Sequence, residues 1–80
     1  MSKLEIRSPL PGTFYRAPSP DVPPFKAEGD TVAASDTIGV IEVMKTFQQI
    51  PAGLNGKNIT FLVENEEPVM AGQIIAEVDP

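Results

Sequence analysis

Proline and glycine recur every few residues in this chain and leave room only for short extended segments. Nine prolines and six glycines are spread over 80 residues, and both residue types disfavour the interior of a helix. The residues between them are rich in β-branched side chains, which favour strands. We therefore expect an all-β fold, a small sandwich or barrel of short strands. The strand candidates are Leu4–Arg7, Thr13–Tyr15, Thr31–Val32, Thr37–Val43, Thr46–Ile50, Lys57–Glu64, Val69 and Gln73–Val78.

The size and residue content of the chain exclude several classes of function. Eighty residues make one domain at most. The absence of cysteine excludes disulfides and thiolate metal sites, and the absence of histidine removes the usual general base and the commonest metal ligand. No nucleophile–base pair can be assembled without these residues. We expect a non-catalytic protein with neither catalytic residues nor a metal site.

The charge and hydropathy of the chain point to a cytoplasmic protein without nucleic-acid or membrane partners. The net charge of −5 disfavours contact with phosphates. No apolar run approaches the roughly 20 residues that a membrane span needs. Met1, Ser2 and Lys3 lead directly into a strand candidate, so no signal peptide is expected. Glu64, Glu66 and Glu67 are interpreted as a solvated turn.

The two halves of the sequence resemble each other. The segment 12–15 aligns with 56–59 at an offset of 44, whereas Val32, Ala34 and Ile38 align with Val69, Ala71 and Ile75 at an offset of 37. The difference of seven residues places an insertion in the first half, between Tyr15 and Val32, where prolines are densest. We interpret the chain as a duplicated four-strand unit with a stiff loop added to the first copy.

A two-residue connection joins the strand candidates 37–43 and 46–51. Such a turn usually needs positive φ at one or both central residues and favours Asn-Gly or Asp-Gly. Here the central residues are Met44 and Lys45, neither of which adopts positive φ easily. A local rule broken at one exposed point suggests a functional site. We predict that the turn presents Lys45, and that the duplication places the chain ends at the opposite pole.

The short turn also sets the register of the hairpin. One face should carry the pairs Val43–Thr46, Ile41–Gln48 and Gly39–Ile50, and the other Glu42–Phe47, Val40–Gln49 and Ile38–Pro51. Ile41, Val43 and Ile50 make the first face the expected core face. Further core candidates are Phe14, Val32, Ile59, Phe61, Val63, Val69, Ile74 and Val78.

The turn and its surroundings resemble a known family. Residues Val43 to Thr46 resemble the Ala/Val-Met-Lys motif of biotinyl domains, in the biotin/lipoyl attachment family. The proline-rich stretch from Ser8 to Asp21 resembles the start of the biotinyl domain in biotin carboxyl carrier proteins of bacterial acetyl-CoA carboxylase. The resemblance extends from about Leu4 to Val78, nearly the whole chain.

The resemblance implies a specific architecture. Residues 1–80 would form a single biotinyl domain, a flattened β-barrel or barrel-sandwich hybrid of two four-stranded antiparallel sheets with pseudo-two-fold symmetry. In the family the proline insertion forms a thumb that leans towards the biotin, which implies a thumb at Ala17–Phe25 here. The thumb residues implied near biotin are Ala17, Pro18, Ser19, Pro20 and Asp21.

The resemblance also implies a function. A biotin protein ligase would join biotin to Lys45 as an amide, with Val43, Met44 and Thr46 completing the attachment motif. Biotin would then accept a carboxyl group on a biotin carboxylase and deliver it to a carboxyltransferase. The implied protein is the non-catalytic carrier of acetyl-CoA carboxylase, in fatty acid biosynthesis and lipid metabolism, or of a related biotin-dependent carboxylase.

The chain departs from the family pattern in ways that leave alternatives open. Thr46 stands where Met is most frequent, and Ala17 where many thumbs have Thr. The N-terminal region and Ala/Pro-rich linker of full-length carriers are absent from these 80 residues, which suits an excised domain or a free-standing small carrier. The acceptor could be acetyl-CoA, another acyl-CoA, a 2-oxo acid or a urea-type molecule.

Two other functions share the predicted fold. One is a lipoyl carrier domain of a 2-oxo acid dehydrogenase or the glycine cleavage system, although lipoyl domains usually have Asp before the lysine and lack a thumb. The other is an unmodified binding module, in which Lys45 would be replaceable.

Overall fold

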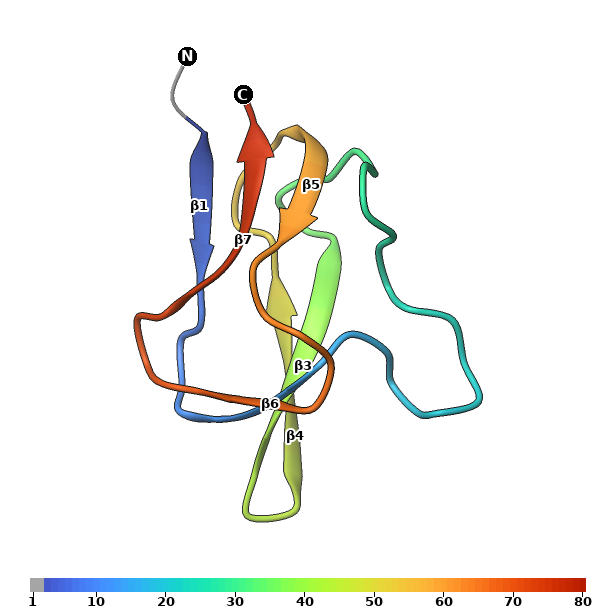
Figure 1. Cartoon of the computed structure of the whole chain (residues 1–80), viewed down its shortest axis with the longest axis vertical. Helices are drawn as coiled ribbons and strands as arrows, with labels where there is room; N and C mark the ends of the chain where they lie inside the picture. The colour runs from blue at the N-terminus through green and yellow to red at the C-terminus, as the bar shows by residue number, and fades with distance from the viewer. Residues whose placement is uncertain (1–2) are drawn as a thin grey trace.

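Residues 3–80 fold into seven short strands in two antiparallel sheets (Figure 1). A computed structural model describes residues 3–80, and within that range no residue is helical, as the sequence predicts. No helix among these residues is long or apolar enough to cross a membrane. The strands are β1 (Leu4–Arg7), β2 (Gly12–Tyr15), β3 (Thr37–Val43), β4 (Thr46–Pro51), β5 (Lys57–Phe61), β6 (Glu67–Val69) and β7 (Ile74–Asp79).

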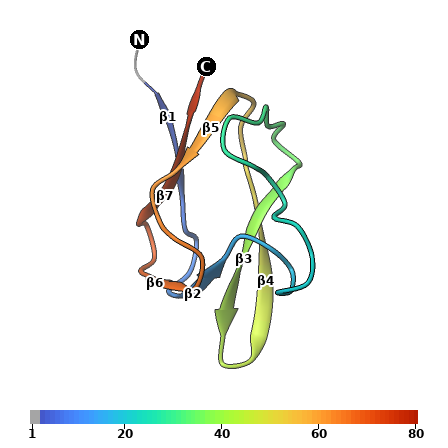
Figure 2. The ribbon, with the colours of Figure 1, turned by 45° about the vertical axis from the view of Figure 1, so that its right-hand side comes forward.

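The two sheets are hydrogen-bonded separately and face each other as a flattened sandwich. One has the order β4-β3-β2-β6 and the other β1-β7-β5 (Figure 2). The prediction of two four-stranded sheets is therefore wrong for the second sheet. Val32, expected in a strand, forms only an isolated bridge with Gly56. The next amide along the chain, Ala33 N–H, donates to the Asp36 carboxylate at 2.9 Å, so no ladder extends past the bridge.

The predicted duplication is confirmed by the strand pairing. Gly12 pairs with Val69, and the corresponding Gly56 bridges the corresponding Val32. The order β4-β3-β2-β6 thus matches β1-β7-β5 followed by the Val32 bridge. The close approaches repeat as well, because an added Cβ would meet the Glu42 carbonyl oxygen at 2.4 Å from Gly12 and the Asp79 carbonyl oxygen at 2.8 Å from Gly56.

A bulge in β5 corrects the alignment of the halves by one residue. The register of β5 shifts between Lys57 and Thr60, around Asn58 with a φ of 58°. Beyond it, Phe14 corresponds to Ile59, since their carbonyls accept equivalent bonds from Glu66 and Gly29. The insertion in the first half is therefore one residue longer than the sequence alignment indicates.

One hydrophobic core fills the space between the sheets, and the predicted core is confirmed apart from one position. Val43 and Phe61 are only partly buried but pack against it. The prediction of Ile74 as a core residue is wrong, because Ile74 is half-buried whereas Ile75 is fully buried. The pairing of β1 with β7 skips Ile75 at a bulge, which turns Ile75 and Ala76 both inward. The buried core residues are Ile6, Phe14, Val32, Ile38, Ile41, Ile50, Ala52, Ile59, Val63, Val69, Ile75, Ala76 and Val78.

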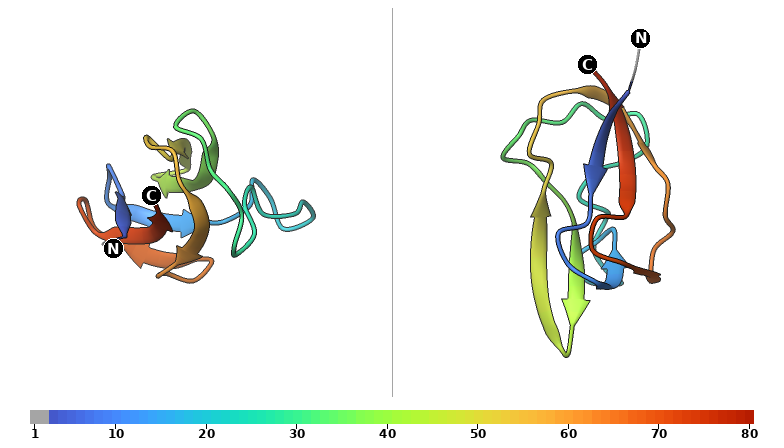
Figure 3. Two further views of the ribbon diagram at one scale, coloured as in Figure 1. Left: turned by 90° about the horizontal axis from the view of Figure 1, so that it is seen from above. Right: turned by 90° about the vertical axis from the view of Figure 1, so that its left-hand side faces the viewer.

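The start of β1 and the C-terminal end of the chain lie at the pole opposite the β3–β4 hairpin, as the duplication predicts for the chain ends (Figures 1 and 3); Met1 and Ser2 lie outside the described residues. The molecule measures 38 × 26 × 20 Å. The loop of residues 16–30 projects to one side of the sandwich and carries the predicted insertion (Figure 1). The β3–β4 turn therefore lies far from the C-terminal end of the chain and from the start of β1.

Candidate functional site

The β3–β4 hairpin ends in the two-residue turn that the sequence predicts. Val43 pairs with Thr46, which leaves only Met44 and Lys45 between the strands. Their φ angles are 50° and 68°, so both lie in the left-handed region. Two positive φ values in a two-residue hairpin loop define a type I′ turn, whose twist matches that of the strands. The predicted backbone strain at the tip is therefore present.

Most of the predicted hairpin register is confirmed. Glu42 pairs with Phe47, and Ile41 pairs with Gln48. The predicted Ile38–Pro51 pair is wrong, because a bulge between Thr37 and Gly39 makes Pro51 the partner of Thr37.

The tip exposes its side chains to solvent. Met44 is 93% exposed, and Lys45 is exposed beside it. Among residues 3–80, no hydrogen bond or ion pair engages the Lys45 amine. The hairpin below it is anchored, since Ile41 of β3 and Ile50 of β4 are both buried in the core. The arrangement presents one primary amine on a fixed corner.

The two faces of the hairpin differ. On one face, Val43, Met44 and Thr46 line a shallow depression of about 360 Å³ together with Leu10, Pro11 and Gln48. On the other face, Phe47 packs against Tyr15 with a ring-centroid distance of 6.2 Å. The Tyr15 hydroxyl donates a hydrogen bond to Glu42 Oε1 at 3.0 Å. This bond, with partial burial and the charges of Glu42 and Glu66, raises the pKa of Tyr15.

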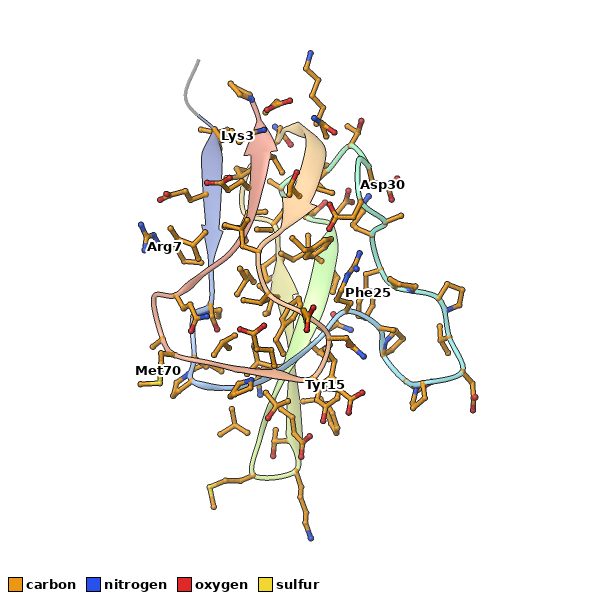
Figure 4. All side chains as sticks on the ribbon, viewed as in Figure 1. Lys3, Arg7, Tyr15, Phe25, Asp30 and Met70 are labelled. Carbon is orange, nitrogen blue, oxygen red and sulfur yellow. The ribbon has the colours of Figure 1, made fainter. Side chains whose placement is uncertain are left out.

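A larger groove opens between this second face and the proline-rich insertion. Its volume is about 710 Å³. Tyr15 lies at its inner wall, on the side of the molecule towards the hairpin tip (Figure 4). Of the five predicted thumb residues, Asp21 is not part of the lining. The lining residues are Tyr15, Arg16, Ala17, Pro18, Ser19, Pro20, Val22, Pro24, Phe47, Asn65 and Glu66.

The insertion forms a closed loop that is fastened at its base. Phe25 N–H donates to the Arg16 carbonyl at 2.9 Å, and Val22 N–H donates to the Ser19 carbonyl at 3.2 Å. The fixed φ of its prolines stiffens the segment between these bonds. We call Ala17–Phe25 the thumb.

Arg16 connects the thumb to the sheets. Its guanidinium carbon lies 4.2 Å from the centroid of the Phe61 ring, and its Nη2 donates to the Lys26 carbonyl at 3.2 Å. Its backbone N–H donates to Asn65 Oδ1 at 2.9 Å. Cation–π contacts of this kind contribute roughly 0.5–2 kcal/mol, depending on solvation. These contacts hold one wall of the groove in a defined position.

The sequence predicts the tip, but it does not predict the wall of the groove that faces the thumb. That wall contains Tyr15, Phe47 and Glu66, which come from three separate segments. The sequence predicts Glu66 only as part of a solvated turn. The predicted Glu42–Phe47 pair carried a usable signal, because an exposed aromatic residue beside the tip marks a surface for contact. Phe47 is 58% exposed.

The chain is similar to known proteins over nearly its whole length. A family model described as "Biotin-requiring enzyme" matches residues 4–78. The chain is 41% identical over 76 residues to a protein of Nostoc sp. named biotin carboxyl carrier protein of acetyl-CoA carboxylase. That match covers 95% of this chain and 42% of the relative.

Two further relatives have the same name. The Streptococcus pyogenes protein is 42% identical over 73 residues, 91% of this chain and 44% of the relative. The Chlamydia trachomatis protein is 42% identical over 67 residues, 84% of this chain and 41% of the relative. The chain thus spans less than half the length of these curated relatives.

Proposed function

The chain belongs to the family described as biotin-requiring enzymes, and from that premise we propose that it is a biotin carboxyl carrier domain with biotin attached to Lys45. The observation that carries the proposal is the strained type I′ turn that exposes this amine. Val43, Met44 and Thr46 would complete the attachment motif around it.

Attachment requires a separate enzyme. An amine attacks an acyl group only after losing a proton, and the sequence contains neither His nor Cys to accept one. A biotin protein ligase would therefore supply the base and approach the tip, where Met44 offers an exposed apolar side chain. The product is an amide, which removes the positive charge of Lys45.

The groove beside the tip suits the cofactor. Biotin has an apolar thioether edge and a polar ureido edge, and the residues that line the groove include Phe47 and prolines together with the polar residues Tyr15 and Glu66. When attached, biotin supplies a ureido nitrogen that carries a carboxyl group between two active sites. The thumb residues that would lie near it are Ala17, Pro18, Ser19, Pro20 and Asp21. The first four line the groove, whereas Asp21 lies outside the lining.

The domain itself contributes position and reach rather than catalysis. A tethered cofactor has a raised effective concentration at each partner site, and the protein supplies its binding and orientation. The partners proposed are a biotin carboxylase and a carboxyltransferase. The names of the relatives favour acetyl-CoA as acceptor, which would place the protein in fatty acid biosynthesis in the cytoplasm. The net charge of −5 argues against nucleic-acid partners.

The test is the intact mass of the chain after co-expression with an active biotin protein ligase. One biotin should be found, and peptide mapping should place it on Lys45. Lys45→Arg should abolish the modification, while the matched control Lys57→Arg, at another exposed lysine, should retain it. An unmodified Lys45 would overturn the proposal, and a lipoyl adduct would select the lipoyl carrier instead. Affinity capture of the biotinylated chain should then retain a carboxyltransferase.

A further inference from the structure

The duplicated halves place different residues at one strained backbone position. Gly29 in the first half and Glu66 in the second have φ angles of 89° and 66°. Both amides donate across to the sheet, Gly29 to the Ile59 carbonyl at 2.8 Å and Glu66 to the Phe14 carbonyl at 2.7 Å. Positive φ is readily adopted by glycine but costs energy in a residue with a Cβ. The first half has glycine at this position, which adopts positive φ without strain, whereas the second half has Glu66, whose side chain is a carboxylate.

The environment of Glu66 suggests what this carboxylate does. Glu66 lines the groove, whereas Gly29 lies outside its lining. Among residues 3–80, its carboxylate is engaged by no hydrogen bond or ion pair. Its charge reaches the groove wall, since it contributes to the raised pKa of Tyr15.

Among the described residues that line the groove, Glu66 is the one that carries a carboxylate. Two other side-chain oxygens already accept hydrogen bonds, Glu42 Oε1 from the Tyr15 hydroxyl and Asn65 Oδ1 from the Arg16 backbone amide. The Glu66 carboxylate is therefore available to a donor that enters the groove.

We propose that Glu66 is a positioning residue whose carboxylate accepts a hydrogen bond from a ureido N–H of the group carried on Lys45. The inference rests on the proposed function. The groove begins close to the tether, because Phe47 lies two residues beyond Lys45, or about 7 Å along an extended strand. Hydrogen bonds to an ionised acceptor are stronger than neutral ones. A dithiolane ring has no N–H to donate, so Glu66 also favours a ureido ring over a lipoyl group.

The test uses the biotinylated chain and measures solvent exchange of the two ureido N–H protons by NMR. In the wild type, exchange of one ureido proton should be several-fold slower than in free biotin. Glu66→Gly should restore the rate of free biotin, and Glu66→Gln should give an intermediate rate. The matched control Glu64→Gln, an exposed glutamate of the same turn outside the groove lining, should keep the wild-type rate.

Thermal unfolding of the unmodified chain separates positioning from a structural role. Glu66→Gly relieves positive φ, so its midpoint should equal or exceed that of the wild type. A lower midpoint would make Glu66 a structural residue and overturn the inference. Equal ureido exchange in wild type and Glu66→Gly, with biotin present on Lys45, would overturn the inference alone. Absence of biotin from Lys45 in the mass spectrum would overturn the proposed function and this inference with it.

Discussion

Replacing Met44-Lys45 by Asn-Gly should stabilise the fold while destroying the attachment site. Both residues have positive φ, 50° and 68°, and left-handed conformation costs an ordinary residue roughly 1–2 kcal/mol. Asn tolerates this region, and Gly adopts it freely but loses about 0.5–1 kcal/mol through its flexible unfolded state. The net gain should be about 1 kcal/mol, which corresponds to roughly 4–8 °C in melting temperature for a domain of this size.

The side chains removed by this double change contribute little to stability. Met44 is 93% exposed, and surface substitutions usually change stability by less than about 0.5 kcal/mol. The assay is urea unfolding of the unmodified proteins, followed by far-ultraviolet circular dichroism. The control is the Ala-Ala variant, which removes the same side chains but keeps a Cβ at positive φ. If Asn-Gly proved no more stable than Ala-Ala, the argument that the tip is strained would be refuted.

Three further predictions concern the thumb, an acid-sensitive contact and the core. Deleting Ala17–Pro24 should leave a folded domain that still accepts biotin but transfers carboxyl groups poorly, because the second half turns here without an insertion; loss of the circular dichroism signal would show that the segment is structural. The hydrogen bond from the Ala33 amide, and then that from Lys26, lower the pKa of Asp36 below its ordinary 3.8. These two contacts therefore stabilise the fold above pH 3.8, and their contribution is lost as the pH falls through the pKa of Asp36 in the folded protein. Asp36→Asn should therefore reduce the acid dependence of the unfolding midpoint, and an unchanged dependence would contradict this assignment. Gly39→Ala would place a Cβ 2.5 Å from Phe14 Cε1 and should lower the free energy of unfolding in urea by about 1–3 kcal/mol.

The tip could be predicted because its constraints are local. The separation of two strand candidates by Met44 and Lys45 leaves one turn length, and that length demands positive φ. The duplication could also be predicted, because Gly12 aligns with Gly56 and Val32 aligns with Val69 in the sequence. In the structure these residues form the equivalent pairs Gly12–Val69 and Gly56–Val32.

The errors in strand register and in which side chains face the core fall at bulges. Ile75 is buried in place of Ile74 because β7 skips one residue against β1. Pro51 pairs with Thr37 because β3 bulges before Gly39. A bulge shifts which side chains face inward without changing residue type, so alternation in the sequence does not reveal it.

The sequence by itself determined an all-β duplicated fold and a lysine on a two-residue corner, because turn length, alternation and proline spacing act between near neighbours. Only the tertiary structure decided that Phe47, Tyr15, the thumb and Glu66 share one groove. Tyr15 and the thumb are close in the chain, but Phe47 and Glu66 come from distant segments, and their approach depends on sheet pairing and on the contacts of Arg16 with Phe61 and Asn65. The strain at Glu66 is evident only in the folded chain, where Glu66 and Gly29 occupy equivalent positions in the two halves and both have positive φ.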